Sequence, residues 1–374
     1  MNKKYRRVSM YPKMTVYLNR IEANARYICE LAAKKGVRIT GVVKSSDNYS
    51  NSYKAIGSAM MRAGTVSLAD SRMKTIERMR EMGVDEHILL LRIPQMWEIS
   101  KVVAFADASL QSDPGTLAAM EEEAAKQDKI HEVILMTDLG DLREGIFNPD
   151  VFHETAVWIE KELPHLRLLG IGTNLGCYGS IVPDEANLKL LVSRAKAIEE
   201  AIGRKLDIVS GGGTSTLPML LNDTLPEGIN HLRVGEGILL GRDLKTIWKL
   251  PFDGLRMDTY MVEAQIIEIE EKPSYPIGTI FVDAFGNTPE YTDIGNRQRA
   301  LLAIGKRDIG SHDALFPIDE AITVVGGSSD HLILDITDSA TPLSVGDIVR
   351  FLPNYQALVN CIESSDVTIV HHLE

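Results

Sequence analysis

The sequence predicts an α/β protein in two parts, a (β/α)8 TIM-like barrel and a C-terminal all-β domain. Two observations predict this fold class. Apolar runs typical of buried strands alternate with helical patterns about eight times, over roughly 240 residues. After about Trp248, short β runs follow one another with turn residues between them. We expect the barrel to span residues 11–247 and the β domain residues 248–374, with residues 1–10 joining the β domain.

The elements of the first part follow from two patterns. Short, continuous apolar runs favour buried parallel strands, whereas apolar residues three and four positions apart favour helices. The expected strands are residues 14–18, 37–44, 65–69, 87–93, 108–111, 132–137, 166–173, 206–210 and 231–235. The expected helices are residues 19–35, 53–62, 74–81, 101–106, 117–127, 151–163 and 186–202. Such alternation forms right-handed crossover units, and about eight of them fit a closed barrel better than an open sheet.

The second part shows mainly strand signals. The expected strands are residues 261–269, 279–282, 322–325, 332–336, 347–351 and 367–370. Turn residues such as Gly286-Asn287 and Gly326-Gly327 separate them. This pattern predicts a second, all-β domain.

The composition argues against several classes of protein. The formal net charge of −12 disfavours nucleic acid or an anionic membrane as a partner. No apolar run approaches the ~20 residues of a membrane span, and no apolar signal segment follows the basic first residues, so we expect a cytoplasmic protein. Cys29, Cys177 and Cys361 lie far apart without CxxC spacing, which argues against a disulfide framework and against a zinc ribbon.

The strand at residues 37–44 ends in Lys44, at the end of a barrel strand where barrel enzymes keep their chemistry. Partial removal from water lowers the pKa of an amine there and makes it a usable Schiff-base nucleophile or general base. The plain alternative is a lysine that extends from the strand end into solvent, and this stretch alone favours that alternative. The other strand ends reverse the preference.

Loops after the barrel strands converge on one face. The residues expected there are Lys44, Asp138, Arg143, Asn174, the loop of residues 211–216 and Arg233. The glycine-rich loop leads into Thr214-Ser215-Thr216 at a helix start, which suits phosphate, although a plain glycine-rich turn is the alternative. The loop has neither the dinucleotide spacing nor the P-loop lysine. A strand-end lysine, a phosphate cradle and a buried guanidinium together describe a site for pyridoxal 5'-phosphate.

Seven segments are shared with one enzyme superfamily. They are residues 41–44 (GVVK), 137–145 (TDLGDLREG), 170–176 (GIGTNLG), 210–215 (SGGGTS), 230–242 (NHLRVGEGILLGR), 328–335 (SSDHLILD) and 354–355 (NY). On these segments the sequence resembles the fold-type III pyridoxal phosphate enzymes, the alanine racemase superfamily, and within it the alanine/ornithine racemase branch. The resemblance covers essentially the whole chain. It implies bound pyridoxal phosphate, a homodimer, and racemisation of a free amino acid, with ornithine favoured and alanine, lysine or serine as alternatives.

The resemblance also implies roles for individual residues. Lys44 would bind the cofactor through its amine and act as one racemisation base. Arg233 would face the pyridine nitrogen, leave it unprotonated and favour racemisation over side reactions. Arg143 would lie near the cofactor's phenolic oxygen or the substrate carboxylate, and Asn174 against the ring, where many relatives carry histidine. The cofactor phosphate would be held by Thr214, Ser215, the backbone N–H groups near Gly235 and Glu236, and the phenols of Tyr49 and Tyr355.

One departure from the family concerns the second base, which alanine racemases supply as a tyrosine of the partner subunit in a Ser-Tyr-Gly context. The matching stretch here is residues 283–286, with Phe285 at the tyrosine position. Phenylalanine cannot carry a proton, so either a neighbour serves or the mechanism differs from the standard two-base one. The candidate neighbours are Asp283, His331 and Tyr291, and Asp330 would also come from the partner's β domain. The loop after Lys44, which contains Tyr49, departs from the family pattern as well.

Two alternatives share the fold. D-threonine aldolases and D-serine dehydratases use a metal held by His and Cys or Asp near the C-terminal end, and the sequence has no His-x-Cys spacing, so no metal site is expected. The small pyridoxal phosphate carrier protein lacks a β domain. If the substrate is ornithine or lysine, an acidic residue should meet its distal amine, and Asp47 and Asp283 are the candidates.

Overall fold

The computed structural model describes residues 10–43, 52–283 and 285–373. These residues form two compact units. The barrel unit is Asn19–Arg256, and the sheet unit combines residues 10–18 with residues 257–373. Within these ranges, no helix is long and apolar enough to cross a membrane.

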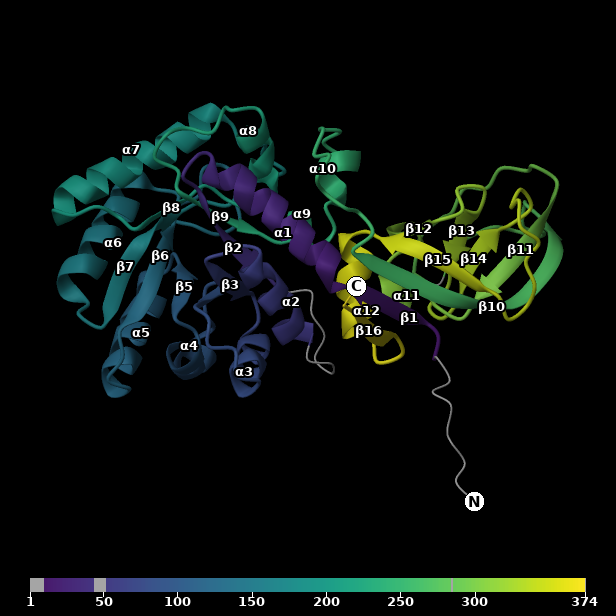
Figure 1. Ribbon diagram of the computed structural model, residues 1–374, viewed down its shortest axis with the longest axis horizontal. Coiled ribbons are helices and arrows are strands. Elements are labelled where there is room, and N and C mark those ends of the chain that lie inside the picture. Colours follow the sequence, from purple (N-terminus) through teal and green to yellow (C-terminus); the bar gives the residue numbers. More distant parts are fainter. Residues whose placement is uncertain (1–9, 44–51, 284, 374) are drawn as a thin grey trace, which may run out of the picture. The chain divides into compact units, whose positions relative to one another are not determined.

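The barrel unit contains a closed ring of parallel strands in chain order, in which β9 pairs back with β2. The strands are β2 (Arg38–Val42), β3 (Ser67–Asp70), β4 (Ile88–Leu90), β5 (Ala108–Gln111), β6 (His131–Met136), β7 (Leu166–Gly172), β8 (Ile208–Ser210) and β9 (His231–Val234). The helices and 3-10 turns are α1 (Leu18–Ala33), α2 (Ser52–Arg62), α3 (Met73–Glu81), η1 (Met96–Glu98), α4 (Ile99–Phe105), α5 (Pro114–Lys126), α6 (Pro149–Glu162), α7 (Glu185–Ile202), η2 (Thr214–Thr216), α8 (Leu217–Leu221), α9 (Glu236–Leu239) and α10 (Arg242–Thr246). Helices α3 to α7 lie around the outside of the strands (Figure 1). The predicted barrel is confirmed.

Side-chain caps explain where the longer outer helices begin. The Asp113 carboxylate accepts the backbone N–H of Thr116 at the start of α5, and Pro114 occupies the first turn. Asn148 and Asp184 cap α6 and α7 in the same way. These caps fix the turns that lead from each strand end into the next helix.

The barrel interior combines an apolar core with two buried histidines. The core side chains are Val42, Ala69, Leu89, Ala108, Leu110, Ile134, Met136 and Leu169. His131 Nε2 lies 2.9 Å from the Ser109 hydroxyl, and His231 hydrogen-bonds to Ser210. Burial lowers the pKa of His131 to about 4 and, with the nearby Arg233 cation, that of His231 to about 3. Both rings are therefore neutral at physiological pH.

We predict that these histidines make the barrel less stable in mild acid. Their pKa values lie below the unfolded value of about 6.5, so the unfolded state binds more protons as the pH falls. Stability is full above pH ~6.5 and declines toward the folded pKa values, with a loss of about 2 kcal/mol per histidine at pH ~5. Urea unfolding at pH ~6.5 and at pH ~5 measures this loss of stability. The His131→Gln variant should lose less stability than wild type, and His153→Gln, on α6, is the control; equal losses in all three would contradict the prediction.

The sheet unit is built on one sheet with strand order β12-β15-β10-β11-β14-β13, and β1 pairs with both β10 and β16. The strands are β1 (Lys13–Tyr17), β10 (Tyr260–Pro273), β11 (Asn296–Leu302), β12 (Leu315–Pro317), β13 (Thr323–Gly327), β14 (Leu332–Asp335), β15 (Ile348–Pro353) and β16 (Thr368–His372). The unit also contains α11 (Lys306–Ile309), η3 (His312–Ala314) and α12 (Tyr355–Glu363). Apart from the β1–β16 pair, the strands pair antiparallel.

The structure divides the chain at residues 256/257, whereas the sequence predicts a boundary at 247/248. It also places residues 11–18 in the sheet unit rather than in the barrel. The reason is strand pairing: Lys13–Val16 pair antiparallel with Tyr260–Glu263, and Lys13–Tyr17 pair parallel with Thr368–His372. The apolar pattern of β1 predicts a strand but not its neighbours.

Two further differences concern the sheet unit. Residues 279–282, predicted as a strand, form none. Phe281 is 79% exposed, so the apolar character of this run does not reflect burial in a sheet. Conversely, β11 carries two arginines and has no apolar run at its start, yet it lies in the middle of the sheet, where Arg297 pairs with Asp335 of β14 at 2.7 Å.

Candidate active site

The C-terminal ends of β6 to β9 carry the predicted barrel residues. Because the strands are parallel, Asp138 after β6, Asn174 after β7, the loop 211–216 after β8 and Arg233 on β9 lie at the same end of the barrel. Asp138 has a local role, since its carboxylate accepts the backbone N–H groups of Gly140 and Leu142.

Arg233 is the buried cation of this end of the barrel. Its side chain is held at two points, because Nη1 donates to the Ser210 hydroxyl at 2.5 Å and Nη2 to the Thr173 carbonyl at 2.9 Å. Only 6% of the residue is exposed. Burial lowers the pKa of Arg233 to about 10, against the opposing effect of the Glu144 carboxylate. The guanidinium is therefore still protonated at neutral pH, with N–H groups left for a ligand.

Gly172 makes room for this arrangement. A Cβ at this position would lie 3.2 Å from the Ser210 Cβ and 3.3 Å from Arg233 Nη1. Gly172 in the segment 170–176 thus has a packing reason that the motif alone did not reveal.

Arg143 lies in the loop after β6 and is paired with its neighbour Glu144, to which its Nη2 donates at 2.7 Å. Burial would lower the pKa of Arg143, but the hydrogen bond and charge of Glu144 raise it above its usual value. Both side chains affect the pKa of Arg233. The loop thus brings a second guanidinium and a carboxylate into the electrostatic environment of Arg233.

Two short helical turns lie side by side after β8 and β9. The Thr214 hydroxyl in η2 accepts the backbone N–H of Gly237 in α9 at 3.1 Å, which ties the turns together. The first N–H groups of a helical turn have no partner within the turn, so the two starts combine their donors. Gly213, just before η2, has no room for a side chain, since a Cβ there would lie 2.8 Å from the Arg233 carbonyl oxygen. The Ser215 hydroxyl donates to the Leu175 carbonyl at 2.8 Å.

Glu236 closes the second turn. Its Oε1 accepts the backbone N–H groups of Arg242 and Asp243 at 3.0 Å each, while Oε2 is buried with no hydrogen-bond partner in the described part of the chain. Burial, with the charge of Asp243, raises the pKa of Glu236 to about 7. The carboxyl therefore fixes the α9–α10 connection, which leaves its backbone N–H as the group suited to an anion.

The loop after β7 is held by an aspartate that the sequence analysis did not single out. Asp141 accepts the backbone N–H groups of Gly176 and Tyr178 at 3.0 Å each. Burial would raise the pKa of Asp141, but these N–H groups bring it below its usual value. Asn174 in the same loop is half-buried and donates to the Cys177 sulfur at 3.1 Å.

In the sheet unit, a lysine that the sequence analysis missed lies against Phe285. The Lys306 ammonium is 4.2 Å from the centre of the phenylalanine ring and 3.7 Å from a carboxylate oxygen of Asp283. Its side chain is only 14% exposed. Asp283 itself caps a turn, since Oδ1 accepts the backbone N–H groups of Phe285 and Asn287 at 2.8 Å each. The hydrogen bond from the Asn287 backbone N–H is the main cause of the lowered pKa of Asp283.

The predicted residues Asp330 and His331 lie beside the same lysine. The backbone N–H of Lys306 donates to the Ser328 carbonyl at 2.9 Å, just before these two residues. Both side chains are exposed, and Arg307 lies 3.5 Å from the Asp330 carboxylate. The structure therefore places Asp283 and Phe285 at the Lys306 side chain and ties the loop of Asp330 and His331 to the backbone at the start of α11. Tyr291, another candidate, instead packs edge-on against Tyr275.

Three predicted residues cannot be placed in this cluster or at the barrel end. Lys44, Asp47 and Tyr49 fall outside the described residues. Val43 is the last described residue before them. Its backbone N–H donates to the Ala69 carbonyl at 2.9 Å, and its side chain is buried. Tyr355 is the first residue of α12 in the sheet unit and is half-buried.

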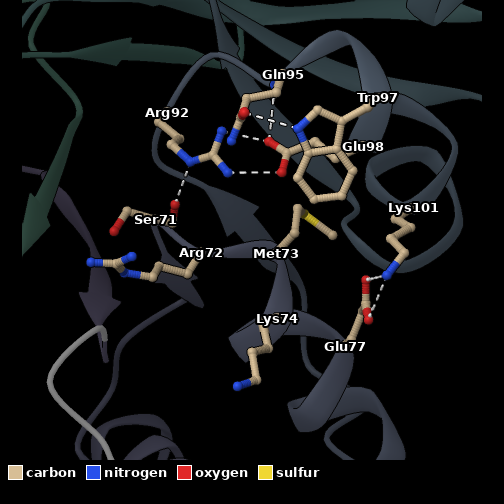
Figure 2. Close-up of a pocket in the computed structure, with 10 residues that line it drawn as sticks. All are labelled: Ser71, Arg72, Met73, Lys74, Glu77, Arg92, Gln95, Trp97, Glu98 and Lys101. Carbon is tan, nitrogen blue, oxygen red and sulfur yellow. Dashed lines mark hydrogen bonds and ion pairs between the residues drawn. The ribbon is translucent and has the colours of Figure 1, made fainter. Parts of the chain in front are cut away.

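A separate pocket of about 590 Å³ opens beyond the ends of β3 and β4. Figure 2 shows its two carboxylates engaged by cations, Glu98 by Arg92 and Glu77 by Lys101. None of the predicted site residues lines it. The pocket is therefore distinct from the residues around Arg233.

The residues at this end of the barrel fit pyridoxal phosphate. The joined starts of η2 and α9 suit a phosphate group. The clamped Arg233 offers N–H donors to a ring nitrogen at the same end. Fold and site together define a barrel protein whose strand ends carry groups suited to a phosphate, with a second, sheet-forming unit.

Comparison with known proteins identifies the family. The family model "Alanine racemase, N-terminal domain" matches residues 16–243. The ornithine racemase of Acetoanaerobium sticklandii is 41% identical over 350 residues, covering 94% of this chain and 96% of that protein. The lysine racemase of Thermotoga maritima is 36% identical over 368 residues, covering 97% and 99%. The chain therefore belongs to the family of the alanine racemase N-terminal domain, and the predicted class, an amino-acid racemase and thus an isomerase, is confirmed.

Solved structures agree on the fold. An alanine racemase of Clostridium difficile 630 superposes with a TM-score of 0.71 at 17% identity, covering 98% of this chain and 97% of that one. A D-threonine aldolase from Filomicrobium marinum gives a TM-score of 0.69 at 15% identity, covering 94% and 89%. At such identities the likeness shows the fold alone.

Proposed function

We propose that this protein is a pyridoxal phosphate-dependent racemase of a free basic amino acid, with ornithine as the preferred substrate. The observation that carries the cofactor assignment is the buried, protonated Arg233 at the same end of the barrel as the joined turns of Thr214 and Gly237. The substrate assignment is supported by the two relatives that match almost the whole chain, an ornithine racemase and a lysine racemase. Lysine is the second candidate, followed by alanine and serine.

The proposed roles in the barrel follow from charge and hydrogen bonding. Pyridoxal phosphate, when bound, supplies an electron-withdrawing ring that acidifies the Cα proton of an attached amino acid. Lys44 holds the cofactor and takes or returns that proton on one face. Arg233 donates to the ring nitrogen and, as a cation, keeps that nitrogen unprotonated, which limits charge spread into the ring and disfavours side reactions. The phosphate is held by Ser215, the backbone N–H groups of Gly235 and Glu236, and other members of the predicted set, namely Thr214, Tyr49 and Tyr355.

A second group must return the proton on the other face, and we assign this role to Lys306. Asp283 is a poor base because its carboxylate is occupied by its own turn and its pKa is lowered. Lys306 lies over the ring of Phe285, the residue at the family's tyrosine position. Its ammonium group, 3.7 Å from a carboxylate oxygen of Asp283, is a proton donor. Donation leaves a neutral amine, which is the base for the opposite direction.

We further propose a homodimer in which the sheet unit of one subunit completes the site of the other. The support is that the loop of Asp330 and His331 is hydrogen-bonded to the start of α11, which carries Lys306, so these polar residues belong to one part of the sheet unit. Light scattering at micromolar concentration should give the mass of a dimer. A fully active monomer would contradict this arrangement. The cytoplasmic location stays a prediction.

The test of the proposed function is a panel of L-amino acids in heavy water. NMR should show loss of the Cα proton, and chiral chromatography should show the D-enantiomer, most rapidly with ornithine. Exchange without D-product would mean that the second proton-transfer group is missing. No exchange with any amino acid would end the racemase proposal.

The distal amine of ornithine needs an acidic partner, and Asp283 is already engaged by Lys306 and by its own turn. We therefore assign this role to Asp47. Asp47→Asn should raise the KM for ornithine by about tenfold, the effect of one charged hydrogen bond, with a smaller change for alanine. An equal change for both substrates would contradict the assignment.

The aldolase, dehydratase and carrier alternatives have no specific observation in their favour. The D-threonine aldolase shares the fold, as do the racemases. In the described ranges, no three His, Cys, Asp or Glu side chains lie grouped as metal ligands would. The sheet unit, which a small carrier protein lacks, is present here.

A further inference from the structure

Arg233 is the first member of a row of buried polar side chains that runs across neighbouring strands of the barrel. Its Nη1 donates to Ser210 Oγ at 2.5 Å, and Ser210 Oγ lies 2.9 Å from His231 Nδ1. On the other side of the ring, His231 Nε2 lies 2.7 Å from Thr40 Oγ1, which is 2.6 Å from Ser67 Oγ. Ser210 is fully buried, and His231 and Thr40 are each 1% exposed. The row connects β9, β8, β2 and β3 without reaching the predicted ligand-binding residues except through Arg233.

The direction of these hydrogen bonds follows from the chemistry of the first donor. A guanidinium only donates, so Ser210 Oγ is an acceptor toward Arg233. Donation from a cation polarises the serine hydroxyl and makes it a better donor to the next group, His231 Nδ1. His231 then carries its proton on Nε2 and donates to Thr40. In the opposite tautomer, Ser210 would accept twice and its own hydrogen would have no acceptor among the described residues.

The charge of the ring agrees with this arrangement. Burial, with the nearby Arg233 and Arg38 cations, lowers the pKa of His231 to about 3, and His87 acts in the same direction. A doubly protonated ring would have to face Ser210, a hydroxyl already held by a cation, with a second donor. His231 is therefore a neutral ring with one defined donor and one defined acceptor.

We propose that Ser210, His231 and Thr40 are positioning residues that fix the orientation of the Arg233 guanidinium, with His231 in the Nε2–H tautomer. Thr173 supplies the second fixed point through its carbonyl, and Gly172 leaves the room that the guanidinium needs. The link from this row to catalysis rests on the proposed function of Arg233. The row itself does not, because it consists of contacts within the barrel unit.

The first experiment reads the tautomer without any cofactor. The full chain is labelled with ¹⁵N in its histidine rings, and His231 is assigned by the loss of its signals in His231→Asn. Because a ring nitrogen with hydrogen and one without give well-separated shifts, the tautomer is read directly. The expected result is a neutral Nε2–H ring from pH ~8 down to pH ~5. An Nδ1–H ring, or protonation in that range, would overturn the proposal.

The second experiment removes one hydroxyl with little change of shape. Thr40→Val replaces Oγ1 by a methyl group, whereas Thr40→Ser keeps the hydroxyl. Thr155→Val, which removes a buried hydroxyl on α6 bonded to the Val151 carbonyl, is the control for stability. In Thr40→Val the His231 signals should shift, and kcat of the loaded enzyme should fall about tenfold with little change in KM. Thr40→Ser should recover most of both effects.

The outcomes separate this proposal from the proposed function. If the protein racemises no amino acid but the Nε2–H tautomer is found and Thr40→Val shifts it, the row stands and the proposed function fails. If racemisation is found but Thr40→Val, folded as judged by thermal unfolding, changes neither the ring signals nor kcat, the positioning role is wrong. Ser210→Ala provides the check closest to Arg233, and it should lower kcat at least as much as Thr40→Val does.

Discussion

Lys44→Ala is expected to lower racemisation by at least about 10⁴-fold and to remove the yellow colour that pyridoxal phosphate gives when bound to a lysine. Lys44 is proposed to hold the cofactor and to move the Cα proton on one face, so its loss removes two functions. Absorbance after incubation with pyridoxal phosphate reads the first, and chiral chromatography the second. Lys54→Ala is the matched control, because Lys54 is on α2 and its amine donates to the Met82 carbonyl at the surface.

The same variant separates binding of the cofactor from the lysine linkage. The joined turns η2 and α9, which are proposed to hold the phosphate, and Arg233 remain in Lys44→Ala. The variant should therefore still bind pyridoxal phosphate, but more weakly and without the absorbance of the linked form. Wild-type protein that stays colourless would contradict the cofactor assignment. Full racemisation by Lys44→Ala would contradict the assignment of the lysine.

The barrel could be predicted because its strands are buried on both faces and read as continuous apolar runs. The sheet unit was harder, since strand pairing there is set by contacts distant in sequence. β11 begins Asn296-Arg-Gln-Arg, and ion pairs with Asp335 and Asp338 accommodate Arg297 in the middle of the sheet. Residues 279–282 show the reverse, an apolar run without a strand partner.

The candidate site divides in the same way. The position of Arg233, Thr214 and Ser215 at one end of the barrel could be predicted because they stand in local motifs at strand ends. The contacts of Ser210 with Arg233 and with His231 could not, because they depend on how neighbouring strands are staggered in the barrel. A histidine at the start of an apolar strand, two positions before the predicted Arg233, was a signal available in the sequence.

Lys306 was missed for a related reason. Phe285 cannot carry a proton, and the replacements expected from the sequence were the acidic, histidine and tyrosine side chains nearby. Lys306 is 21 positions further along the chain, and only the fold brings its amine within 4.2 Å of the ring centre. The Gly305 that precedes it packs against the Ser329 carbonyl, where a Cβ would come within 2.1 Å, so the turn that presents Lys306 also fixes the Asp330 loop.

Lys306→Met is expected to lower racemisation by about 10²- to 10³-fold, the usual contribution of one general acid or base. Methionine keeps the length and apolar stem of the side chain and removes only the proton-carrying group. In heavy water, the enantiomer whose proton Lys44 removes should still exchange at Cα, while its conversion to the other enantiomer is lost. Lys272→Met, an exposed lysine on β10 paired with Glu268, is the matched control in the same unit.

Mixing two inactive variants tests whether Lys306 acts across the proposed dimer. Lys44→Ala removes the barrel group and Lys306→Met the sheet-unit group, so a mixed dimer has one site with both lysines if each site combines groups from two subunits. Because half of randomly mixed dimers are mixed, activity should recover to about a quarter of wild type after the subunits are exchanged. The Lys272→Met protein, mixed in the same way with Lys44→Ala, gives the reference value. No recovery, together with normal subunit exchange, would show that Lys306 does not supply the second proton from the partner.

In the heavy-water test, equal loss of Cα exchange for both enantiomers in Lys306→Met would show that the lysine supports binding rather than proton return on one face.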